Sequence, residues 1–331
     1  MSALLLPALG LIVGVLGLLW GADRFVAGSA GAARNYGISP LVIGLTVVSI
    51  GTSAPEILVS VNAALNQASE LAVGNALGSN LANIGLVLGI TALIAPIPVQ
   101  KHLLSQEAVV LLFITAAAGL CLYDGYLGRG ESLLLGSLVL PLIFITIKYK
   151  KNHTSPEEIA AGEEIPNITM AAAGLWFVVG LIVLLASAEV TVWSAKTIAQ
   201  SMGISELVIG LTVVAIGTSL PELAASAVSA LRGHHDIAIG NVFGSNLFNI
   251  MLVMTSAGAI APIALTPEVF SRDFLSLAAM TFLLVAMVAF ALFRGARSGT
   301  PARLSRRFGF ILVGGYGLYY LILWPYVVNA A

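Results

Sequence analysis

Two glutamates stand alone in long apolar stretches, and they are the residues best suited to chemistry there. Glu56 ends the run IGTSAPE and Glu222 ends AIGTSLPE, so each directly follows a proline. A proline cannot donate the usual helical hydrogen bond and it crowds the preceding turn, which frees backbone carbonyls near Ser49 and Ala215. An ionised carboxylate in apolar surroundings is costly unless a cation pairs with it. We therefore interpret each motif as half of a cation site.

The other oxygen atoms in these motifs favour a hard cation. Hydroxyl groups precede each proline, at Thr52 and Ser53 in the first motif and at Thr218 and Ser219 in the second. Carboxylate, carbonyl and hydroxyl oxygens suit calcium and, with fewer charges per ion, sodium; neither motif contains a His or Cys for zinc or copper. A protonated structural glutamate is the simpler alternative, but two glutamates in matching polar settings favour a function.

A second polar element follows each glutamate motif: GNALGSNLAN after the first and GNVFGSNLFN after the second. A serine and an asparagine stand four residues apart in each, Ser79 with Asn83 and Ser245 with Asn249, which places them on one helical face. We interpret both asparagines as ion ligands in preference to interhelical hydrogen-bonding groups. The glycines of these elements are better explained by close helix packing than by ion contact.

These motifs occur twice because the chain contains an internal duplication. The segment Leu41–Asn83 returns without a gap as Leu207–Asn249, a shift of 166 positions (249 − 83). About 30 of the 51 aligned positions from Gly37 to Val87 are identical, which exceeds what a shared short motif would give.

Composition identifies the class of protein. Hydrophobic residues make up 58% and charged residues 9% of the 331 residues, whereas a soluble domain carries about 25% charge. The sequence predicts an all-α polytopic membrane protein with ten transmembrane helices, since a span needs about 17–25 apolar residues. The expected spans are 3–21, 38–65, 71–97, 106–123, 130–149, 168–187, 204–231, 237–262, 271–293 and 306–327. The first lacks a basic leader and a cleavage site, so we expect a retained helix and not a signal peptide.

The sizeable polar break Lys148–Pro166 divides the chain into halves. We predict an N-terminal five-helix repeat at 1–149, a cytoplasmic linker at 150–167 and a C-terminal five-helix repeat at 168–331. A regulatory calcium site in the linker is the alternative, but the regular ligand spacing of a calcium loop is missing. Because each half has an odd number of spans, the two copies cross the membrane in opposite senses as inverted repeats.

The distribution of basic residues predicts the orientation. Loops after odd-numbered spans hold twelve of them, and the other side holds three, which places both termini outside the cytoplasm of a multi-pass protein of the cell inner (plasma) membrane. The first set is Arg24, Arg34, Lys101, Lys148, Lys150, Lys151, Arg232, Arg294, Arg297, Arg303, Arg306 and Arg307, and the second is Arg129, Lys196 and Arg272.

Four further titratable residues receive weaker interpretations. Asp23 and Glu189 occupy matching positions at the outgoing ends of the first and sixth spans, where we expect helix-end or gate-mouth residues. His234 and His235 lie between the seventh and eighth spans, where a solvated turn is a simpler interpretation than a pH sensor.

The paired GTSAPE/GTSLPE and GSNLAN/GSNLFN elements resemble the alpha-repeats of the calcium/cation antiporter superfamily, in particular the prokaryotic sodium/calcium exchangers. The resemblance covers essentially the whole chain and implies the sodium/calcium exchanger fold, with four central ion sites that share both glutamates. It further implies that the first and sixth helices slide as a pair against the other eight. The ligands it implies are Glu56, Glu222, Thr52, Thr218, the carbonyls of Ser49 and Ala215, Ser53, Ser219, Ser79, Ser245, Asn83 and Asn249.

Asn249 is a departure, because some exchangers of this family carry aspartate there. If that aspartate is protonated, asparagine imitates it; if it is ionised, this chain has lost a charge. Two glutamates neutralise one Ca²⁺ or two Na⁺, so a third sodium would bring a net positive charge into a site of low dielectric.

We expect a secondary active antiporter that exports cytoplasmic Ca²⁺ in exchange for Na⁺ by alternating access. A Ca²⁺/H⁺ antiporter of the same fold is the alternative, and a passive cation channel is a more remote one, since its pore would open to both sides. An enzyme is not expected, because no nucleophile with a base and no metal triad occurs in the motifs. The expected partners are Ca²⁺, Na⁺ or H⁺ and the lipid bilayer, with no cofactor, nucleic acid or obligate protein partner.

Overall fold

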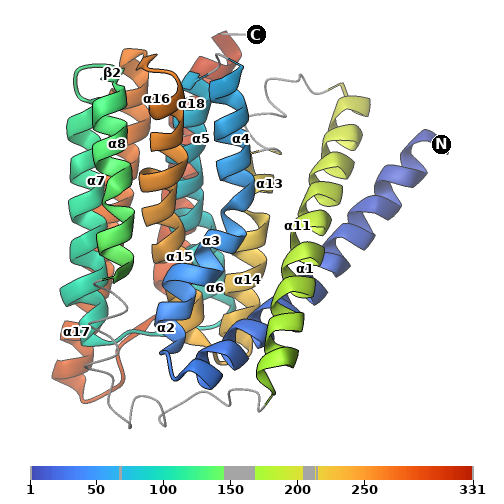
Figure 1. The fold of residues 1–331 in the computed structure, drawn as a ribbon, viewed down its shortest axis with the longest axis vertical. Coiled ribbons are helices and arrows are strands. Elements are labelled where there is room, and N and C mark those ends of the chain that lie inside the picture. Colours follow the sequence, from blue (N-terminus) through green and yellow to red (C-terminus); the bar gives the residue numbers. More distant parts are fainter. Residues whose placement is uncertain (1, 67–68, 145–167, 204–212, 214, 330–331) are drawn as a thin grey trace.

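The computed structural model describes residues 2–66, 69–144, 168–203, 213 and 215–329, and its elements are predominantly helices (Figure 1). The elements of the first half are α1 (Ser2–Tyr36), α2 (Pro40–Ile43), the π-helical η1 (Gly44–Val48), α3 (Ser49–Thr52), α4 (Ala54–Leu65), α5 (Ser69–Ala82), η2 (Asn83–Leu88), α6 (Gly89–Ile94), β1 (Ile97–Pro98), η3 (Leu103–Glu107), α7 (Ala108–Leu122), β2 (Tyr126–Leu127) and α8 (Arg129–Ser137). Those of the second half are α11 (Met170–Ser201), α13 (Ala215–Thr218), α14 (Leu220–Leu231), α15 (His235–Phe248), η5 (Asn249–Met254), α16 (Thr255–Ile260), β3 (Ile263–Ala264), η6 (Val269–Phe274), α17 (Leu275–Ser298), β4 (Arg303–Leu304) and α18 (Arg306–Asn329).

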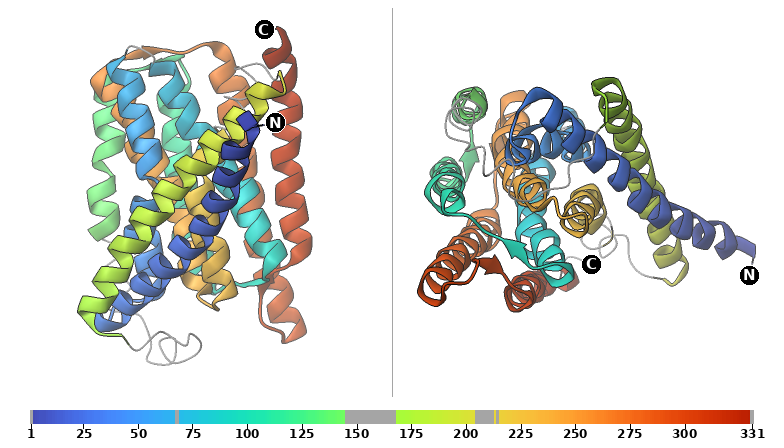
Figure 2. Two further views of the ribbon diagram at one scale, coloured as in Figure 1. Left: turned by 90° about the vertical axis from the view of Figure 1, so that its right-hand side faces the viewer. Right: turned by 90° about the horizontal axis from the view of Figure 1, so that it is seen from below.

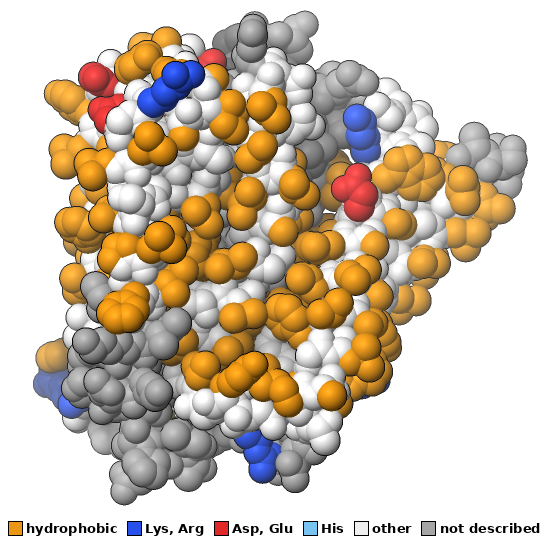
Figure 3. All heavy atoms as spheres, in the orientation of Figure 1, with side chains coloured by type: hydrophobic (Ala, Val, Ile, Leu, Met, Phe, Trp, Pro, Cys, Tyr) orange, Lys and Arg blue, Asp and Glu red, His pale blue; other side chains and the backbone are white. Residues whose placement is uncertain are grey.

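Within the described residues, seven helices are long and apolar enough to cross a membrane, and an eighth span results if a pair bent by 46° is counted as one. The bent pair is Pro40–Thr52 with Ala54–Leu65. These eight correspond to eight of the ten predicted spans. The other two, 130–149 and 204–231, extend into residues outside the described part. The predicted linker, 150–167, lies entirely outside it. Figure 3 shows hydrophobic side chains over the full height of one face, as a lipid-facing surface requires.

The first and sixth spans are longer than predicted. We expected 3–21 and 168–187, but α1 continues to Tyr36 and α11 to Ser201. Arg24 and Arg34 therefore lie on a helix and not in a loop. The hydropathy of the sequence falls at Asp23, yet nothing breaks the helix until Gly37, which takes a left-handed φ of 63°. Its repeat mate, Gly203, has a φ of 78° just beyond α11.

Helices α1 and α11 form a pair that crosses one side of the bundle obliquely (Figures 1 and 2). Small residues let their backbones approach: a Cβ atom on Gly21 would lie 2.6 Å from the backbone nitrogen of Leu184. The guanidinium of Arg24 on α1 lies 4.6 Å from the ring centre of Trp176 on α11. Close glycine packing and a cation–π contact both tie the pair together.

We expect Gly180→Ala on α11 to destabilise this pair. Its Cβ would fall against the backbone of Phe25 and Arg24, including the Cα of Phe25 at 2.7 Å, so the helices would have to separate. Overpacking of this kind costs about 1–3 kcal/mol. Thermal unfolding in detergent measures the loss. Gly174→Ala on the same helix is the matched control, because a Cβ there meets nothing within 4 Å. Equal melting temperatures for the two variants would contradict the close packing.

The other described elements form the bundle behind this pair, with the duplicated motifs at its centre. Helix α4 packs against α5, and α14 packs against α15, so the two halves repeat the same arrangement. Short antiparallel strands join the halves: β1 pairs with β4 through Ile97 and Leu304, and β2 pairs with β3 through Leu127 and Ile263. Ile97 and Ile263 differ by 166 positions, so β1 and β3 are repeat-related strands. Each of them pairs with a strand of the other half.

The packing role expected for the motif glycines holds in α15. A Cβ on Gly240 would lie 2.7 Å from the carbonyl oxygen of Leu41, and one on Gly244 would meet the side chain of Ser49. Both glycines are buried where α15 crosses α2, η1 and α3. For Gly74 and Gly78 of α5, the equivalent partner segment lies mostly outside the described residues.

Candidate cation-binding site

Each glutamate motif forms the expected helix break. Helix α3 ends at Thr52 and α4 begins at Ala54, with Ser53 between them at φ −81° and ψ 7°. In the second half α13 ends at Thr218 and α14 begins at Leu220, around Ser219 at φ −89° and ψ 5°. Each proline lies in the first turn of the following helix, where its missing N–H is tolerated. The break therefore places each glutamate in the first turn of a new helix.

The carbonyl of Ser49 has protein hydrogen-bond donors nearby, although the sequence predicted that the proline break would free it. It accepts the N–H of Ser53 at 3.0 Å and faces the Thr52 hydroxyl at 3.4 Å. Across the repeat, the N–H of Ser219 donates to Ile216 at 3.1 Å. A carbonyl has two lone pairs, so the Ser49 oxygen keeps one for an ion only while the Thr52 hydrogen points elsewhere.

The carboxyl groups of Glu56 and Glu222 are completely buried, each at 0% exposure. The two motifs meet directly, because the hydroxyl of Ser53, three residues before Glu56, donates to Glu222 Oε1 at 3.0 Å. Among the described residues, both carboxyl oxygens of Glu56 and the Oε2 of Glu222 have no hydrogen-bond partner. Buried carboxyl oxygens without partners are costly, and a hard cation would satisfy them.

Neutral polar groups without partners among the described residues lie at the start of α14 and on the elements that contact the two glutamate helices. The two asparagines begin the π-helical stretches η2 and η5. Helix α4 contacts η5 and α14 contacts η2, so each glutamate helix packs against the π-helical stretch that begins with the asparagine of the other half. The predicted ligand residues contribute six of the buried side-chain atoms that lack hydrogen-bond partners within the described part, besides the glutamate oxygens: Asn83 Oδ1 and Nδ2, Asn249 Oδ1 and Nδ2, Ser219 Oγ and Ser245 Oγ. Their oxygens supply the neutral ligands that a calcium or sodium site requires.

The remaining predicted ligands lie on α3, α5 and α13. Ser79 is buried on α5, and Thr218 is partly buried at the end of α13. Ala215 begins α13, where only its backbone is described. Thr52 is fully buried and donates to Asn241 Oδ1 at 3.1 Å.

Asn75 and Asn241 are residues that sequence reasoning missed. The amide nitrogen of Asn241 donates to the carbonyl of Glu222 at 3.3 Å and to Ser226 Oγ at 2.9 Å. Asn75 makes the equivalent bonds to Glu56 and Ser60, both at 3.2 Å. Each asparagine thus holds the backbone of one glutamate. The sequence feature that could have identified them is that they are repeat mates, 166 positions apart (241 − 75) inside the duplicated segment.

A second pair of missed asparagines joins the two halves. The amide of Asn80 on α5 donates to the carbonyl of Asn246 on α15 at 3.1 Å, and these residues are also repeat mates. Together with the Ser53–Glu222 and Thr52–Asn241 bonds, this contact brings polar residues of the two halves together.

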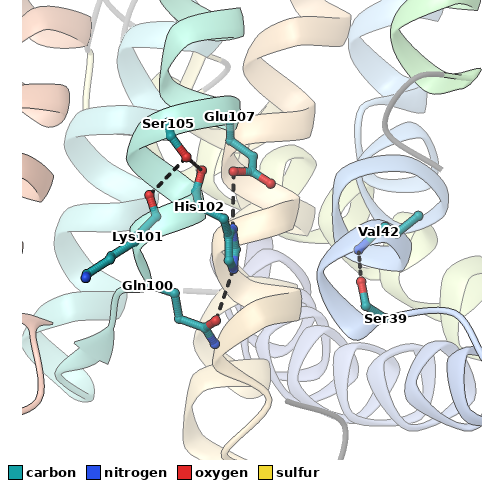
Figure 4. Close-up of polar contacts among 7 residues, drawn as sticks. All are labelled: Ser39, Val42, Gln100, Lys101, His102, Ser105 and Glu107. Carbon is teal, nitrogen blue, oxygen red and sulfur yellow. Dashed lines mark hydrogen bonds and ion pairs between the residues drawn. The ribbon is translucent and has the colours of Figure 1, made fainter. Parts of the chain in front are cut away.

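Two other buried carboxylates, Glu107 and Asp273, are repeat mates but differ from Glu56 because each is paired with a protein group. Glu107 is 6% exposed and lies 3.3 Å from His102 Nδ1, as Figure 4 shows. Asp273 binds Arg272 through two bonds of 2.7 and 2.8 Å and accepts the Tyr319 hydroxyl at 3.0 Å. Both are therefore satisfied by protein groups, whereas Glu56 is not.

The weaker sequence interpretations require correction. Asp23 does not end its helix; it lies within α1 and forms an ion pair with Arg232, at the end of α14. Glu189 also lies within its helix, exposed on α11. The solvated-turn interpretation is wrong for His234, which is 3% exposed. The turn folds back because the His234 N–H donates to the carbonyl of Ser229 at 2.8 Å.

Comparisons with known proteins identify the family. The family described as "Sodium/calcium exchanger protein" matches residues 6–149 and 172–324. CaxA of Alkalimonas amylolytica is 43% identical over 325 residues, covering 96% of this chain and 99% of CaxA. The inner membrane protein YrbG of Escherichia coli (strain K12) is 38% identical over 326 residues, covering 97% and 98%.

A solved structure shares both the fold and the sequence pattern. The sodium-calcium exchanger NCX_Mj superposes with a TM-score of 0.81 at 32% sequence identity, over 96% of this chain and 98% of that one. The fold, the paired helix breaks and the family match agree. The chain belongs to the sodium/calcium exchanger family, whose members are cation transporters and not enzymes.

Proposed function

We propose that the protein is a secondary active antiporter that exports cytoplasmic Ca²⁺ in exchange for Na⁺ entering down its gradient. The observation that carries this proposal is the pair of completely buried glutamates, Glu56 and Glu222, because three of their four carboxyl oxygens lack protein partners among the described residues. A buried pair of this kind can hold one divalent ion or two monovalent ions without excess charge. The ions are cargo, and the proposal requires no resident cofactor.

The proposed ligands combine the two carboxylates with neutral oxygens of both halves. Either ion would draw on a subset of Glu56, Glu222, Thr52, Thr218, Ser53, Ser219, Ser79, Ser245, Asn83, Asn249 and the carbonyls of Ser49 and Ala215. Oxygen-only ligation supports Ca²⁺ and Na⁺ over transition metals.

The architecture that we propose is ten helices in two inverted five-helix repeats, 1–149 and 168–331, joined by a cytoplasmic linker at 150–167. The duplicated hydrogen bonds of Asn75 and Asn241 support the repeat. Both chain ends lie toward the same end of the molecule (Figure 1), as an even number of spans requires. The basic loop residues favour both termini outside the cytoplasm and insertion in the inner membrane.

Alternating access is supported by a difference between repeat-related positions. Gly240 and Asn241 are buried on α15, whereas Gly74 is exposed and Asn75 is partly exposed on α5. In an inverted repeat these positions lie toward opposite sides of the membrane, so one side is more accessible than the other. We propose that the α1–α11 pair slides to exchange the two arrangements, and that the Asp23–Arg232 ion pair stabilises the closed cytoplasmic side.

A Ca²⁺/H⁺ antiporter is the second candidate, in which Glu56 and Glu222 would bind protons where we propose sodium. The buried hydroxyls of Ser219 and Ser245 favour sodium, because a proton needs no cage of oxygens. A passive channel is less consistent with carboxylates at 0% exposure, since a channel filter is open to both sides.

The test is uptake of radiolabelled calcium into proteoliposomes under an imposed Na⁺ gradient and, separately, under a pH gradient. We expect uptake when the lumen is loaded with Na⁺ and the outside contains none. Uptake driven by the pH gradient alone would favour proton exchange, and uptake without any counter-ion would establish a channel.

A further inference from the structure

The side chain of Asn241 contacts both halves of the cation site. Its amide nitrogen donates to the carbonyl of Glu222 at 3.3 Å and to Ser226 Oγ at 2.9 Å, within its own half. Its amide oxygen accepts the hydroxyl of Thr52 at 3.1 Å, from a residue 189 positions away. All four residues are completely buried. Asn241 therefore links the two helix breaks through direct hydrogen bonds.

The hydrogen-bond partners of the Asn241 side chain fix the orientation of its amide. Its nitrogen faces an acceptor, the Glu222 carbonyl, and this leaves Oδ1 toward Thr52. Because that oxygen is only an acceptor, the Thr52 hydroxyl must supply the hydrogen. The lone pairs of Thr52 Oγ1 are then free to face a cation, whereas the hydrogen would repel one.

The alternative acceptors for the Thr52 hydrogen are the carbonyl of Ser49, at 3.4 Å, and the carboxylate of Glu222. That carbonyl already accepts the Ser53 N–H at 3.0 Å, and a carbonyl has two lone pairs. If Thr52 also donated to it, the Ser49 oxygen would have no lone pair left for an ion. By taking the Thr52 hydrogen, Asn241 keeps two proposed ligands, Thr52 Oγ1 and Ser49 O, available together.

We propose that Asn241 is a positioning residue for cation binding, which holds the Thr52 hydroxyl with its lone pairs toward the ion and leaves the Ser49 carbonyl free. This inference rests on the proposed antiport function. The nitrogen and oxygen of Asn241 both contact protein groups, those of Glu222, Ser226 and Thr52, and through these contacts it positions the ligands.

Asn75 provides a matched control within the same chain. It holds the Glu56 carbonyl and Ser60 Oγ as Asn241 holds their repeat mates. Both of its described hydrogen bonds remain within its own half, so the Thr52 bond distinguishes the two asparagines. A comparison of Asn241→Ala with Asn75→Ala separates the positioning of Thr52 from the support of a glutamate backbone.

The experiment measures Na⁺-driven calcium uptake in proteoliposomes for four proteins in a cycle: wild type, Asn241→Ala, Thr52→Val and the double variant. Asn241→Ala should raise the apparent KM for Ca²⁺ by about tenfold, with a smaller change in maximal rate, because two ligands lose their orientation. Asn75→Ala should raise it by about threefold. In the Thr52→Val background no hydroxyl remains to be oriented. There Asn241→Ala should raise the KM only by the factor of about three expected for Asn75→Ala.

An equal rise in KM from Asn241→Ala with and without the Thr52 hydroxyl would overturn the inference, as would a lower maximal rate at unchanged KM. If Asn241→Ala does not give a folded protein, Ser226→Ala replaces it, since that variant removes the 2.9 Å bond that anchors the amide. Its effect on KM should also depend on Thr52, and independence would contradict the inference. If wild-type protein takes up no calcium under a Na⁺ gradient, the proposed function itself fails, and the two outcomes are thereby distinguished.

Discussion

Glu56→Gln and Glu222→Gln are each expected to abolish Na⁺-driven calcium uptake while leaving the protein folded. Glutamine has nearly the same shape as glutamate but carries no charge, so one of the two charges that balance a divalent ion is lost. Both side chains are completely buried, so bulk solvent does not screen the loss of the charge. Uptake of radiolabelled calcium into Na⁺-loaded proteoliposomes gives the activity, and size-exclusion chromatography in detergent gives the folding state.

Glu107→Gln is the matched control for these variants. Glu107 is also a buried carboxylate on a membrane-spanning segment, but its partner is His102 and it lies outside the candidate site. An amide oxygen can accept the same hydrogen bond from the imidazole, so most of the uptake should persist. Normal transport by Glu56→Gln or Glu222→Gln would remove that glutamate from the site. Loss of transport in all three variants would indicate a general sensitivity to neutralising buried carboxylates.

The sequence predicted the helix breaks because their cause is local. A proline lacks the N–H of an interior helical residue and crowds the preceding turn, so Pro55 and Pro221 favour a new helix start, which places Glu56 and Glu222 in its first turn. The duplication then predicted that the two glutamates act together. The hydrogen bond from Ser53 to Glu222 brings the two motifs into contact.

The lengths of α1 and α11 could not be predicted in the same way. A hydropathy average ends a span where charges begin, at Asp23 and Arg24, but those charges are held by partners distant in sequence, Arg232 and Trp176. A helix continues through charged residues when tertiary contacts satisfy them, and only the left-handed Gly37 ends it.

The role of Asn241 was also hidden from the sequence, for a related reason. An asparagine beside a glycine is ordinary in a packed membrane helix, and its importance follows from the contact with Thr52, 189 positions away. The burial of His234 depends similarly on the fold of the turn around it.

Asn249 determines how many charges the site can balance. It is completely buried at the start of η5, and both of its amide atoms lack partners among the described residues. With Glu56 and Glu222 as the fixed charges, two Na⁺ or one Ca²⁺ leave the site neutral, whereas three Na⁺ leave one positive charge. Exchange of Ca²⁺ for two Na⁺ therefore moves no net charge, and exchange for three moves one.

We expect the three-sodium cycle, and hence a flux that responds strongly to membrane potential. One elementary charge crossing 100 mV is worth about 2.3 kcal/mol, which changes the equilibrium calcium ratio about 50-fold. In Na⁺-loaded proteoliposomes each cycle would carry one positive charge out, so a lumen-positive potential should accelerate calcium uptake. Calcium flux is measured at fixed ion gradients while valinomycin and K⁺ set the potential. A flux that does not change with potential would establish the two-sodium cycle.

Asn249→Asp provides an independent check on residue 249, because it adds a third carboxyl group to the proposed cluster. A new titratable group next to Glu56 and Glu222 should make calcium uptake depend more steeply on pH, since its charge changes how strongly the site holds Na⁺ and Ca²⁺. Asn66→Asp is the control, because Asn66 is exposed at the end of α4 and gains the same group in water. The pH profile of uptake should change for the first variant and not for the second. Identical profiles for Asn249→Asp and wild type would place residue 249 outside the ion cluster, and the charge count would then rest on the two glutamates alone.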